Sequence, residues 1–301
     1  MCQSSSRERR ISVPMTERED RTYRQLIAWG SAQLAKEEID NVEHDAFALL
    51  AETFQIDRVW YLMHCNEQAD AVQAARYEAL IQARRQHIPL QHLTGKAAFW
   101  GREFVVNEQV LVPRFDTEVL IEEALKYVTA DSKVLDMCTG SGCIAITLAL
   151  ETGCSVMAVD VSKQALEVAQ KNKELLAATQ VELIQSDLFE RLRADQDAQQ
   201  FDCIVSNPPY IATCEIQALS REVREHDPLL ALDGHEDGLF FYRKITKESA
   251  AFLKSGGRLI YEIGYNQAEA VCKLMQENGF VECSVIKDLA GMDRVVRGRL
   301  Y

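Results

Sequence analysis

The sequence predicts a mainly parallel α/β sheet preceded by a small all-helical domain. Three observations lead to this fold class. Short apolar strands alternate with helical segments from residue 133 onward, which is the pattern of βαβ units with right-handed crossovers. A glycine-bearing turn follows the first of these strands, at residues 138–142. Residues 16–87, by contrast, repeat apolar side chains at three- and four-residue steps and contain no proline, as amphipathic helices do.

The length and composition describe a two-domain globular protein. The chain has 301 residues, of which 47% are hydrophobic and 26% charged; this length exceeds one ordinary domain and suits two. No apolar run approaches the roughly 20 residues that a membrane-spanning helix needs. Residues 1–15 are basic and serine-rich but lack the apolar segment of a signal peptide. We therefore expect a disordered start to a cytoplasmic protein.

Cysteine usage, histidine spacing and charge exclude several classes of site. The nine cysteines are scattered, odd in number and without a CxxC pair, which favours reduced thiols over a disulfide framework. The six histidines form no cluster at metal-ligand spacing, so we expect no metal site. The formal net charge is −13. Since non-specific affinity for nucleic acid comes from neutralising phosphates with Lys and Arg, this charge weighs against a long duplex as substrate.

The helical domain is expected over residues 16–88. Asp45, Asp57 and Asn66 stand where its helices would begin, because such side chains accept hydrogen bonds from the free N–H groups of a first turn. Pro89 ends the helical pattern. Residues 90–112 then place glycines at turn positions between β-forming residues. This pattern predicts a β-hairpin linker over residues 89–112.

The α/β domain is expected over residues 113–301. It opens with an amphipathic helix capped by Asp116 or Thr117. The predicted strands are 133–137, 155–160, 181–187, 201–206, 257–264, 281–287 and 294–300, and the predicted helices that follow are 142–151, 162–176, 238–253 and 266–278. Because no helix separates the last two strands, one of them should run antiparallel at an edge of the sheet.

The segment VLDMCTGSGCIAI, residues 134–146, joins the first predicted strand to the next helix. In a parallel α/β sheet this turn borders the ligand crevice at the carboxyl ends of the strands. Gly140 and Gly142 let the backbone approach a ligand, and the helix start offers free N–H groups. Asp160 ends the next strand, where a carboxylate reaches a ribose hydroxyl. The pattern permits a dinucleotide, with Ala145 as the third small residue, or an adenosine-bearing cofactor such as S-adenosylmethionine.

Two further strand ends favour S-adenosylmethionine. Asp187 ends the third predicted strand, where a carboxylate suits an adenine amino group. Asn207 ends the fourth and opens the run Asn-Pro-Pro-Tyr over residues 207–210. This run has no evident use in hydride transfer, whereas it suits a methyl acceptor.

The Asn-Pro-Pro-Tyr run has the features of a site for methyl transfer to an amide or to an exocyclic amine. Such a nitrogen is a poor nucleophile because its lone pair is delocalised. The Asn207 side-chain oxygen and the Pro208 carbonyl can each accept an N–H hydrogen bond, which orients the nitrogen and favours its pyramidal form. Proline has no N–H and a fixed φ, which holds that carbonyl in place. Tyr210 can stack on a planar amide or base.

Over nearly its whole length, the chain resembles the HemK/PrmC family of protein N5-glutamine methyltransferases. The resemblance lies in residues 89–120, 134–146, 206–211, 228–245, 262–267 and 287–296. It implies the class I S-adenosylmethionine-dependent methyltransferase fold, which is Rossmann-like with a mainly parallel seven-stranded sheet. It also implies methylation of the glutamine in the Gly-Gly-Gln motif of peptide chain release factors 1 and 2, with S-adenosyl-L-homocysteine as the second product.

The same resemblance implies the site residues. Those expected to hold the cofactor are Cys138, Thr139, Gly140, Ser141, Gly142, Asp160, Asp187, Leu188 and Asn207. Those expected to bind the glutamine are Asn207, Pro208, Pro209 and Tyr210, with Phe99 and Trp100 lining the same pocket and Arg114 near it. Asn207, Pro208 and Tyr210 would be the catalytic residues. The helical domain would dock the protein substrate, and we expect a monomer that binds neither membrane nor nucleic acid.

The sequence departs from the family pattern at two positions, and two other functions stay open. Cys138 replaces the first loop glycine of many methyltransferases, and Phe115 replaces the second proline of a common Pro-Arg-Pro. The Asn-Pro-Pro-Tyr run is shared with amino-methyltransferases that act on adenine or guanine in DNA or RNA. A binding module that keeps the cofactor pocket without activity is the third possibility. Residues 215–227 predict a solvated helix or a lid over the acceptor site.

Overall fold

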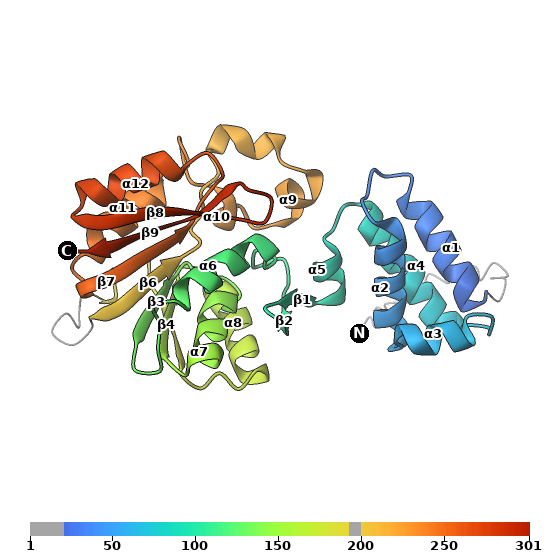
Figure 1. Ribbon diagram of the computed structural model, residues 1–301. Helices are drawn as coiled ribbons and strands as arrows, with labels where there is room; N and C mark the ends of the chain where they lie inside the picture. The colour runs from blue at the N-terminus through green and yellow to red at the C-terminus, as the bar shows by residue number, and fades with distance from the viewer. Residues whose placement is uncertain (1–20, 193–199) are drawn as a thin grey trace, which may run out of the picture. The chain divides into compact units, whose positions relative to one another are not determined.

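The computed structural model of the protein describes residues 21–192 and 200–301. The chain divides into two compact units, Met1–Gln86 and His87–Tyr301, whose elements are labelled in Figure 1. The expected disordered start, residues 1–15, lies outside the described residues. Within the described ranges, no helix is both long and apolar enough to cross a membrane.

The first unit is helical, as predicted. It contains α1 (Tyr23–Leu34), α2 (Val42–Phe54), α3 (Arg58–His64) and α4 (Ala71–Arg85). Periodic apolar residues of these helices are fully buried, namely Leu26, Leu34, Leu49, Leu50, Tyr77 and Ile81. Gly30 of α1 faces Tyr77 of α4 so closely that a Cβ at residue 30 would collide with the tyrosine hydroxyl. A small residue is therefore needed where these two helices meet.

One of the three predicted helix starts in this unit is confirmed. Asp57 precedes α3, and its carboxylate accepts a hydrogen bond from the backbone nitrogen of Trp60 at 2.7 Å. Asp45 instead lies inside the first turn of α2, where it is buried and pairs with Arg84 at 2.7 Å. The Asn66 prediction is wrong, because the residue that caps α4 is Asp70, four positions later.

The predicted hairpin is present and belongs to the second unit. It follows the short helix α5 (Leu90–Thr94) and consists of β1 (Lys96–Phe99) and β2 (Arg102–Val105), which pair antiparallel. Trp100 and Gly101 form its two-residue turn, with φ values of 49° and 68°; positive φ at both positions is the geometry that matches the twist of a hairpin. The hairpin is pinned to the sheet domain by Asn172, whose side-chain oxygen accepts from the backbone nitrogen of Val105 at 2.6 Å.

The second unit carries a seven-stranded sheet in the order β5-β4-β3-β6-β7-β9-β8. Its strands are β3 (Lys133–Met137), β4 (Ser155–Asp160), β5 (Val181–Gln185), β6 (Phe201–Ser206), β7 (Leu253–Glu262), β8 (Phe280–Lys287) and β9 (Asp293–Leu300). Neighbours pair in parallel except around β9. One antiparallel strand was expected at an edge. The antiparallel strand is β9, which is inserted between β7 and β8, so the edge position was wrong.

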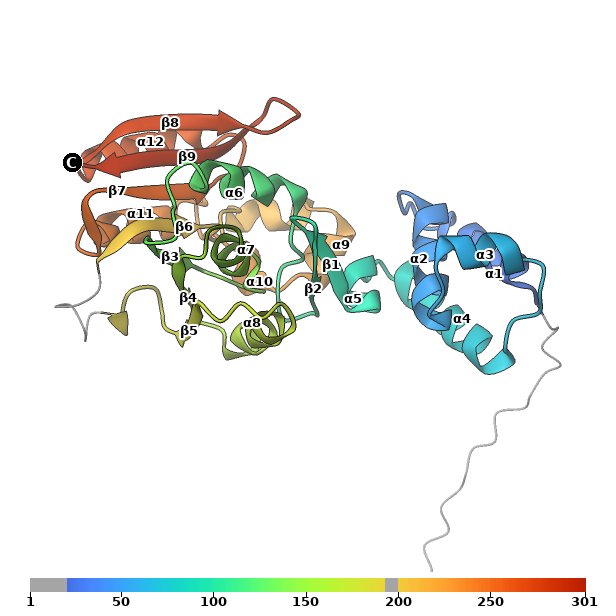
Figure 2. The same cartoon turned by 60° about the horizontal axis from the view of Figure 1, so that its bottom comes forward.

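Helices cover both faces of this sheet (Figures 1 and 2). On one face, α6 (Glu118–Ala124) and α7 (Cys143–Thr152) share a buried apolar cluster with alternate strand residues such as Val134 and Val205. On the other face, α11 (Phe240–Ser249) and α12 (Ala268–Glu277) pack on the intervening residues, such as Leu135. Two covered faces explain why the strands are apolar throughout.

The remaining helices lie near the carboxyl ends of the strands or beside the hairpin. They are η1 (Phe115–Thr117), α8 (Lys163–Leu175), η3 (Thr213–Ala218), α9 (Arg221–His226) and α10 (Leu229–Leu232). The predicted helix that Asp116 or Thr117 would cap does form, as α6 after η1. Thr117 is the N-cap residue of this helix, as predicted, but its side chain makes no capping hydrogen bond to the first turn. Backbone hydrogen bonds of the preceding 3-10 turn satisfy N–H groups at the start of this helix instead.

Candidate active site

A cavity of about 380 Å³ opens at the carboxyl ends of the parallel strands, a size typical of a site for a small organic ligand. Residues that directly follow or end β3, β4, β5 and β6 all reach it. Those predicted from the sequence are Cys138, Thr139, Gly140, Ser141, Asp160, Asp187, Leu188, Asn207, Pro209 and Arg114. The structure thus brings most of the predicted site together around one cavity.

The glycine loop after β3 is shaped by residues in the left-handed region of φ. Gly140 has φ 55° and Gly142 has φ 81°. A Cβ on Gly142 would press on the side chains of Ala169 and Ile146 at 3.1 and 3.2 Å, whereas a Cβ on Gly140 would meet nothing within 4 Å. Gly142 is therefore required for packing against α8, and Gly140 leaves open space in the cavity. Cys138 also has a positive φ, 63°, a conformation that glycine would adopt at lower cost.

Asp136 supports the loop from behind. It is completely buried, and its Oδ2 accepts from the Thr139 hydroxyl at 2.6 Å and from the backbone nitrogen of Ala145 at 3.2 Å. Burial raises the pKa of this carboxyl to about 7, although both hydrogen bonds act in the opposite direction. The carboxyl thus ties the loop to the first turn of α7.

Asp160, at the end of β4, closes onto the same loop. Its Oδ2 accepts from the backbone nitrogen of Gly140, and its Oδ1 accepts from that of Ser162, both at 2.9 Å. Burial raises the pKa of Asp160, while these backbone N–H groups lower it. The carboxylate lines the cavity and keeps lone pairs for a ligand hydroxyl.

Asp187 and Leu188 reach the cavity from the loop after β5. The strand was predicted to run to Asp187 but ends at Gln185. Asp187 is exposed and Leu188 is buried with φ 45°. The strand ends early because the chain turns at Ser186, whose hydroxyl accepts from the backbone nitrogen of Arg191 at 3.0 Å.

The Asn-Pro-Pro-Tyr run follows β6 directly. Asn207 and Pro209 line the cavity, and Pro208 and Pro209 are buried. The Ser206 hydroxyl just before them donates to the Met137 carbonyl at 2.7 Å, which locks the ends of β6 and β3 together. The Asn207 carboxamide is consequently presented at a fixed place beside the glycine loop.

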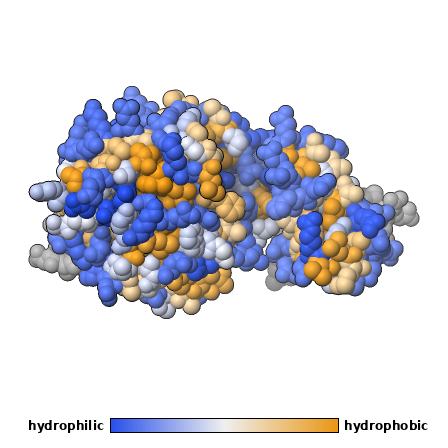
Figure 3. All heavy atoms as spheres, viewed as in Figure 1, coloured by the Kyte–Doolittle hydropathy of each residue, from blue (hydrophilic) through white to orange (hydrophobic). Residues whose placement is uncertain are grey.

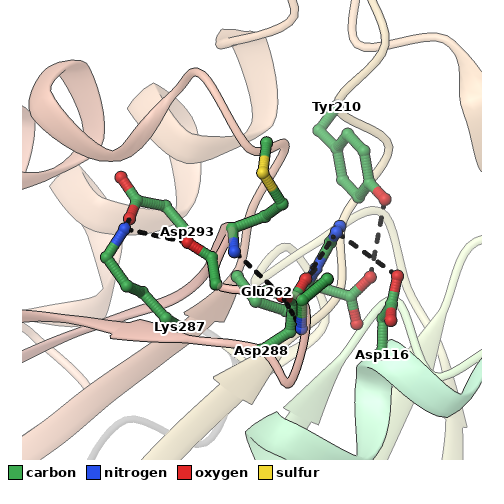
Figure 4. Close-up of polar contacts among 10 residues, drawn as sticks. Asp116, Tyr210, Glu262, Lys287, Asp288 and Asp293 are labelled. Atoms are coloured by element: carbon green, nitrogen blue, oxygen red, sulfur yellow. Dashed lines mark hydrogen bonds and ion pairs between the residues drawn. The ribbon is translucent and has the colours of Figure 1, made fainter.

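Tyr210 follows Pro209 but is not among the residues that line the cavity, and it is held by its surroundings. Its backbone carbonyl accepts from the Gln267 side chain at 2.8 Å, and its hydroxyl donates to Glu262 Oε1 at 3.5 Å. Figure 4 shows this hydroxyl pointing onto the Glu262 carboxylate. A Cβ on Gly234 or Gly238 would strike the Tyr210 backbone. Burial raises the pKa of Tyr210 far above its usual value, so the hydroxyl stays protonated at neutral pH.

The aromatic pair of the hairpin lies elsewhere. Phe99 is 1% exposed and packs edge-to-face against Phe104 in the core. Trp100 is half-buried, and its backbone nitrogen donates to Glu118 at 2.7 Å. Neither is among the residues that line the cavity. Arg114 does line it and pairs with the buried Asp227 at 2.8 Å.

Three positioning residues were not predicted. Asn172 of α8 donates to the Ser141 carbonyl at 2.9 Å and so links the glycine loop to the hairpin. Thr117 accepts from the Asn207 side-chain nitrogen at 3.4 Å. Glu262 was noted only as part of a run similar to the family. The available signal was that Glu262 is a carboxylate within a predicted apolar strand of the same sheet, 257–264, two residues before its predicted end.

The segment predicted as a solvated helix or lid forms η3 and α9, joined to α10. Leu229 and Leu230 of α10 line the cavity, while both side chains remain more than half exposed to solvent. Among the described residues, no group of three or more His, Cys, Asp or Glu side chains is placed to hold a metal ion.

The cavity fits an adenosine-bearing cofactor. Gly140 leaves open space where any other residue would project a side chain, and two carboxylates, Asp160 and Asp187, face the same space as possible acceptors for hydroxyl and amino groups. Buried Leu188 adds an apolar surface for a base.

Comparisons with known proteins identify relatives that match most of the chain. The family model of the PrmC N-terminal domain matches residues 25–95, and that of the methyltransferase small domain matches residues 114–235. A release factor glutamine methyltransferase of Geobacter sulfurreducens is 40% identical over 93% of this chain and 97% of its own. The release factor glutamine methyltransferase of Cereibacter sphaeroides is 42% identical over 89% of this chain and 95% of its own. That of Clostridium acetobutylicum is 37% identical over 84% of this chain and 89% of its own. The resemblance seen in the sequence is confirmed, and the chain belongs to the family of release factor glutamine methyltransferases.

Proposed function

We propose that this enzyme transfers a methyl group from S-adenosylmethionine to the side-chain amide nitrogen of the glutamine in the Gly-Gly-Gln motif of peptide chain release factors. The observation that carries the proposal is the position of Asn207, whose carboxamide stands at the cavity beside the glycine loop. A carboxamide is suited to hydrogen bonding with another amide, and membership of the family supports release factors as substrates.

The cofactor would be held by residues around the glycine loop. Bound there, S-adenosylmethionine supplies an electrophilic methyl group on a sulfonium sulfur. Thr139, Gly140, Ser141 and Gly142 would surround its methionine part, with Cys138 beside them. Asp160 would accept from the ribose hydroxyls, Asp187 and Leu188 would hold the adenine, and Asn207 would border the methyl group.

The acceptor amide would be oriented rather than deprotonated. The Asn207 side-chain oxygen and the Pro208 carbonyl would each accept one N–H of the glutamine amide, which aims the nitrogen lone pair at the methyl group. The buried prolines fix these acceptors. Tyr210, protonated at neutral pH because burial raises its pKa, would support the glutamine side chain as a neutral aromatic surface rather than as a base.

The helical unit, residues 16–88, would dock the protein substrate. Apolar side chains reach the surface of this unit (Figure 3), among them Leu62 and Met63 of α3, which are 68% and 69% exposed. A contiguous patch of exposed apolar side chains, unlike single scattered ones, marks an interaction surface. Residues 89–112 would link this domain to residues 113–301, which would carry out catalysis. Release factors 1 and 2 would both be substrates for a monomeric cytoplasmic enzyme.

A methyl-transfer assay tests this function. Labelled S-adenosylmethionine is offered separately with release factor, duplex DNA and ribosomal RNA, and the modified position is mapped by mass spectrometry. We expect label on the Gly-Gly-Gln glutamine alone. Label on adenine or guanine would replace the proposed substrate by nucleic acid, and label on none of the three would favour a cofactor-binding module without this activity.

A further inference from the structure

Thr117 lies between the side chain of Asn207 and the buried carboxylate of Glu262. It is the last residue of η1, is 3% exposed and lines the cavity. Its Oγ1 accepts a hydrogen bond from the Asn207 Nδ2 at 3.4 Å. A threonine hydroxyl has one proton to donate and lone pairs to accept with. Its own proton is therefore directed elsewhere whenever Asn207 donates to it.

Glu262 is the acceptor available for that proton. It ends β7 and is 2% exposed. Its Oε1 accepts from Tyr210, while Oε2 is buried without a hydrogen-bond donor assigned among the described residues. The Thr117 hydroxyl also acts on this carboxyl, since hydrogen bonding by Thr117 lowers the pKa of Glu262. A hydroxyl proton rotates freely about its C–O bond, and a buried carboxylate oxygen without a donor is costly.

We propose that Glu262, acting through the Thr117 hydroxyl, determines which end of the Asn207 carboxamide faces the acceptor nitrogen. An ionised carboxylate can only accept hydrogen bonds. It draws the Thr117 proton toward itself, which leaves the Thr117 oxygen as an acceptor. Asn207 must then turn its NH₂ group to Thr117 and its oxygen to the cavity. This inference rests on the proposed function, in which that oxygen accepts an N–H of the glutamine amide.

The same carboxylate orients Tyr210, the last residue of the Asn-Pro-Pro-Tyr run. Tyr210 donates its hydroxyl proton to Glu262 Oε1, so Glu262 would receive both hydroxyls, that of Tyr210 on Oε1 and that of Thr117 on Oε2. Only an ionised side chain can accept both bonds without offering a proton back. Glu262 is thus a positioning residue, and it is not itself among the residues that line the cavity.

The charged groups around Glu262 determine when it is ionised. Burial and, to a smaller extent, Asp116 raise the pKa of Glu262, while Thr117, Arg294 and Tyr210 lower it, and the result is a pKa of about 7. Arg294 of β9 reaches Asp288 and Asp116 at 3.1 and 3.3 Å, and Figure 4 shows Asp116 and Asp288 close to Glu262. The protonated form below pH 7 would donate a hydrogen bond. The Thr117 proton could then turn to Asn207, and the carboxamide would lose its fixed orientation.

The test measures kcat against pH for wild type, Glu262→Gln and Thr117→Val, using full-length release factor with substrate and cofactor saturating. Glutamine offers one acceptor and one donor, so it cannot serve both hydroxyls. We expect each variant to lose about tenfold in kcat, the size expected for one misdirected hydrogen bond, with cofactor affinity unchanged in calorimetry. Thr147→Val is the matched control, because Thr147 is also fully buried and its hydroxyl has no partner assigned in the described structure.

The pH profile distinguishes positioning from mere stabilisation. Wild-type kcat should rise through about pH 7 as Glu262 loses its proton. Glu262→Gln should lack that part of the rise and keep only the pH dependence that comes from the titration of Asp136 and Asp227. The double variant should lose little more than either single one, because both act on the same carboxamide. Wild-type turnover or an unchanged pH profile in Glu262→Gln would overturn the inference. Failure of the wild-type enzyme to methylate release factor would instead overturn the proposed function.

Discussion

The carboxylate of Asp160 lies 2.9 Å from the backbone nitrogen of Gly140 and accepts its hydrogen bond. The end of the second strand of the sheet therefore closes onto the glycine loop that follows the first. The contact joins residues 20 positions apart in the chain, and the parallel pairing of β3 with β4 brings them together. A ligand bound at the glycine loop would therefore lie next to the Asp160 carboxylate.

Asp160→Ala should weaken binding of the cofactor. The substitution removes the proposed acceptor for the ribose hydroxyls and also frees the Gly140 and Ser162 nitrogens that Asp160 holds. Loss of hydrogen bonds to a charged group corresponds to about tenfold to a hundredfold in affinity, which titration calorimetry measures directly. Asp202→Ala is the control, since Asp202 also accepts from a backbone nitrogen, that of Lys133 at 2.8 Å, but at the opposite end of the strands. Unchanged affinity in Asp160→Ala would remove this residue from the cofactor site.

Gly142→Ala should mainly lower the stability of the protein, whereas Gly140→Ala should mainly lower its affinity for the cofactor. Both add a Cβ at positive φ, which costs about 1 kcal/mol. At Gly142 the new Cβ also presses on Ala169 and Ile146, and such crowding costs about 1–3 kcal/mol more. At Gly140 the Cβ meets only open cavity, so the loss should appear in cofactor affinity. Urea unfolding and calorimetry on both variants separate the two effects, and equal stability loss would contradict this assignment.

The sequence predicts those parts of the site that depend on local pattern. Asp160 and Asn207 are identifiable because each directly ends an apolar strand, and in a parallel sheet such ends meet at one edge. The glycine loop is identifiable for the same reason. The hairpin follows from its turn residues, since Gly101 permits the positive φ that the turn requires.

The remaining parts depend on contacts that no local pattern encodes. Thr117 meets Asn207 from 90 positions away. Asn172 looks like a solvated polar residue of an amphipathic helix, yet it is fully buried against Val105 and Ser141. The sequence likewise does not determine that β9 is inserted between β7 and β8. The apolar pattern of these strands would be satisfied equally well with β8 beside β7.

Asp136→Asn should change how stability depends on pH. Burial raises the folded-state pKa of Asp136 to about 7, against about 4 in an unfolded chain. Between these values the folded protein holds a proton that the unfolded chain has released, so stability falls as pH rises and levels off above pH 7. The contribution is about 4 kcal/mol at most. Asparagine retains an oxygen for Thr139 and carries no charge.

Urea unfolding at pH 5 and pH 8 measures this difference. The loss of unfolding free energy between the two values should be smaller in Asp136→Asn than in the wild type, while the burial-raised pKa values of Glu262 and Asp227 keep part of the dependence in both. Asp131→Asn, at an exposed position, should match the wild type. An identical pH dependence in Asp136→Asn would show that this carboxyl does not titrate in the folded protein as burial requires.

Asn207→Ala should abolish most turnover while leaving the cofactor bound. The variant removes the oxygen proposed to accept the glutamine N–H, and loss of one preorganised polar contact in an active site costs about a hundredfold or more in kcat. Cofactor affinity should change little, because the glycine loop and Asp160 remain. Asn278→Ala is the matched control: Asn278 also donates through its side chain, to the Leu274 carbonyl at 2.8 Å, but at the end of α12. Single-turnover methyl transfer measures the chemical step without product release. A rate near that of the wild type would show that the acceptor nitrogen is oriented by backbone carbonyls alone, and Asn207 would then have to be assigned to packing at the end of β6.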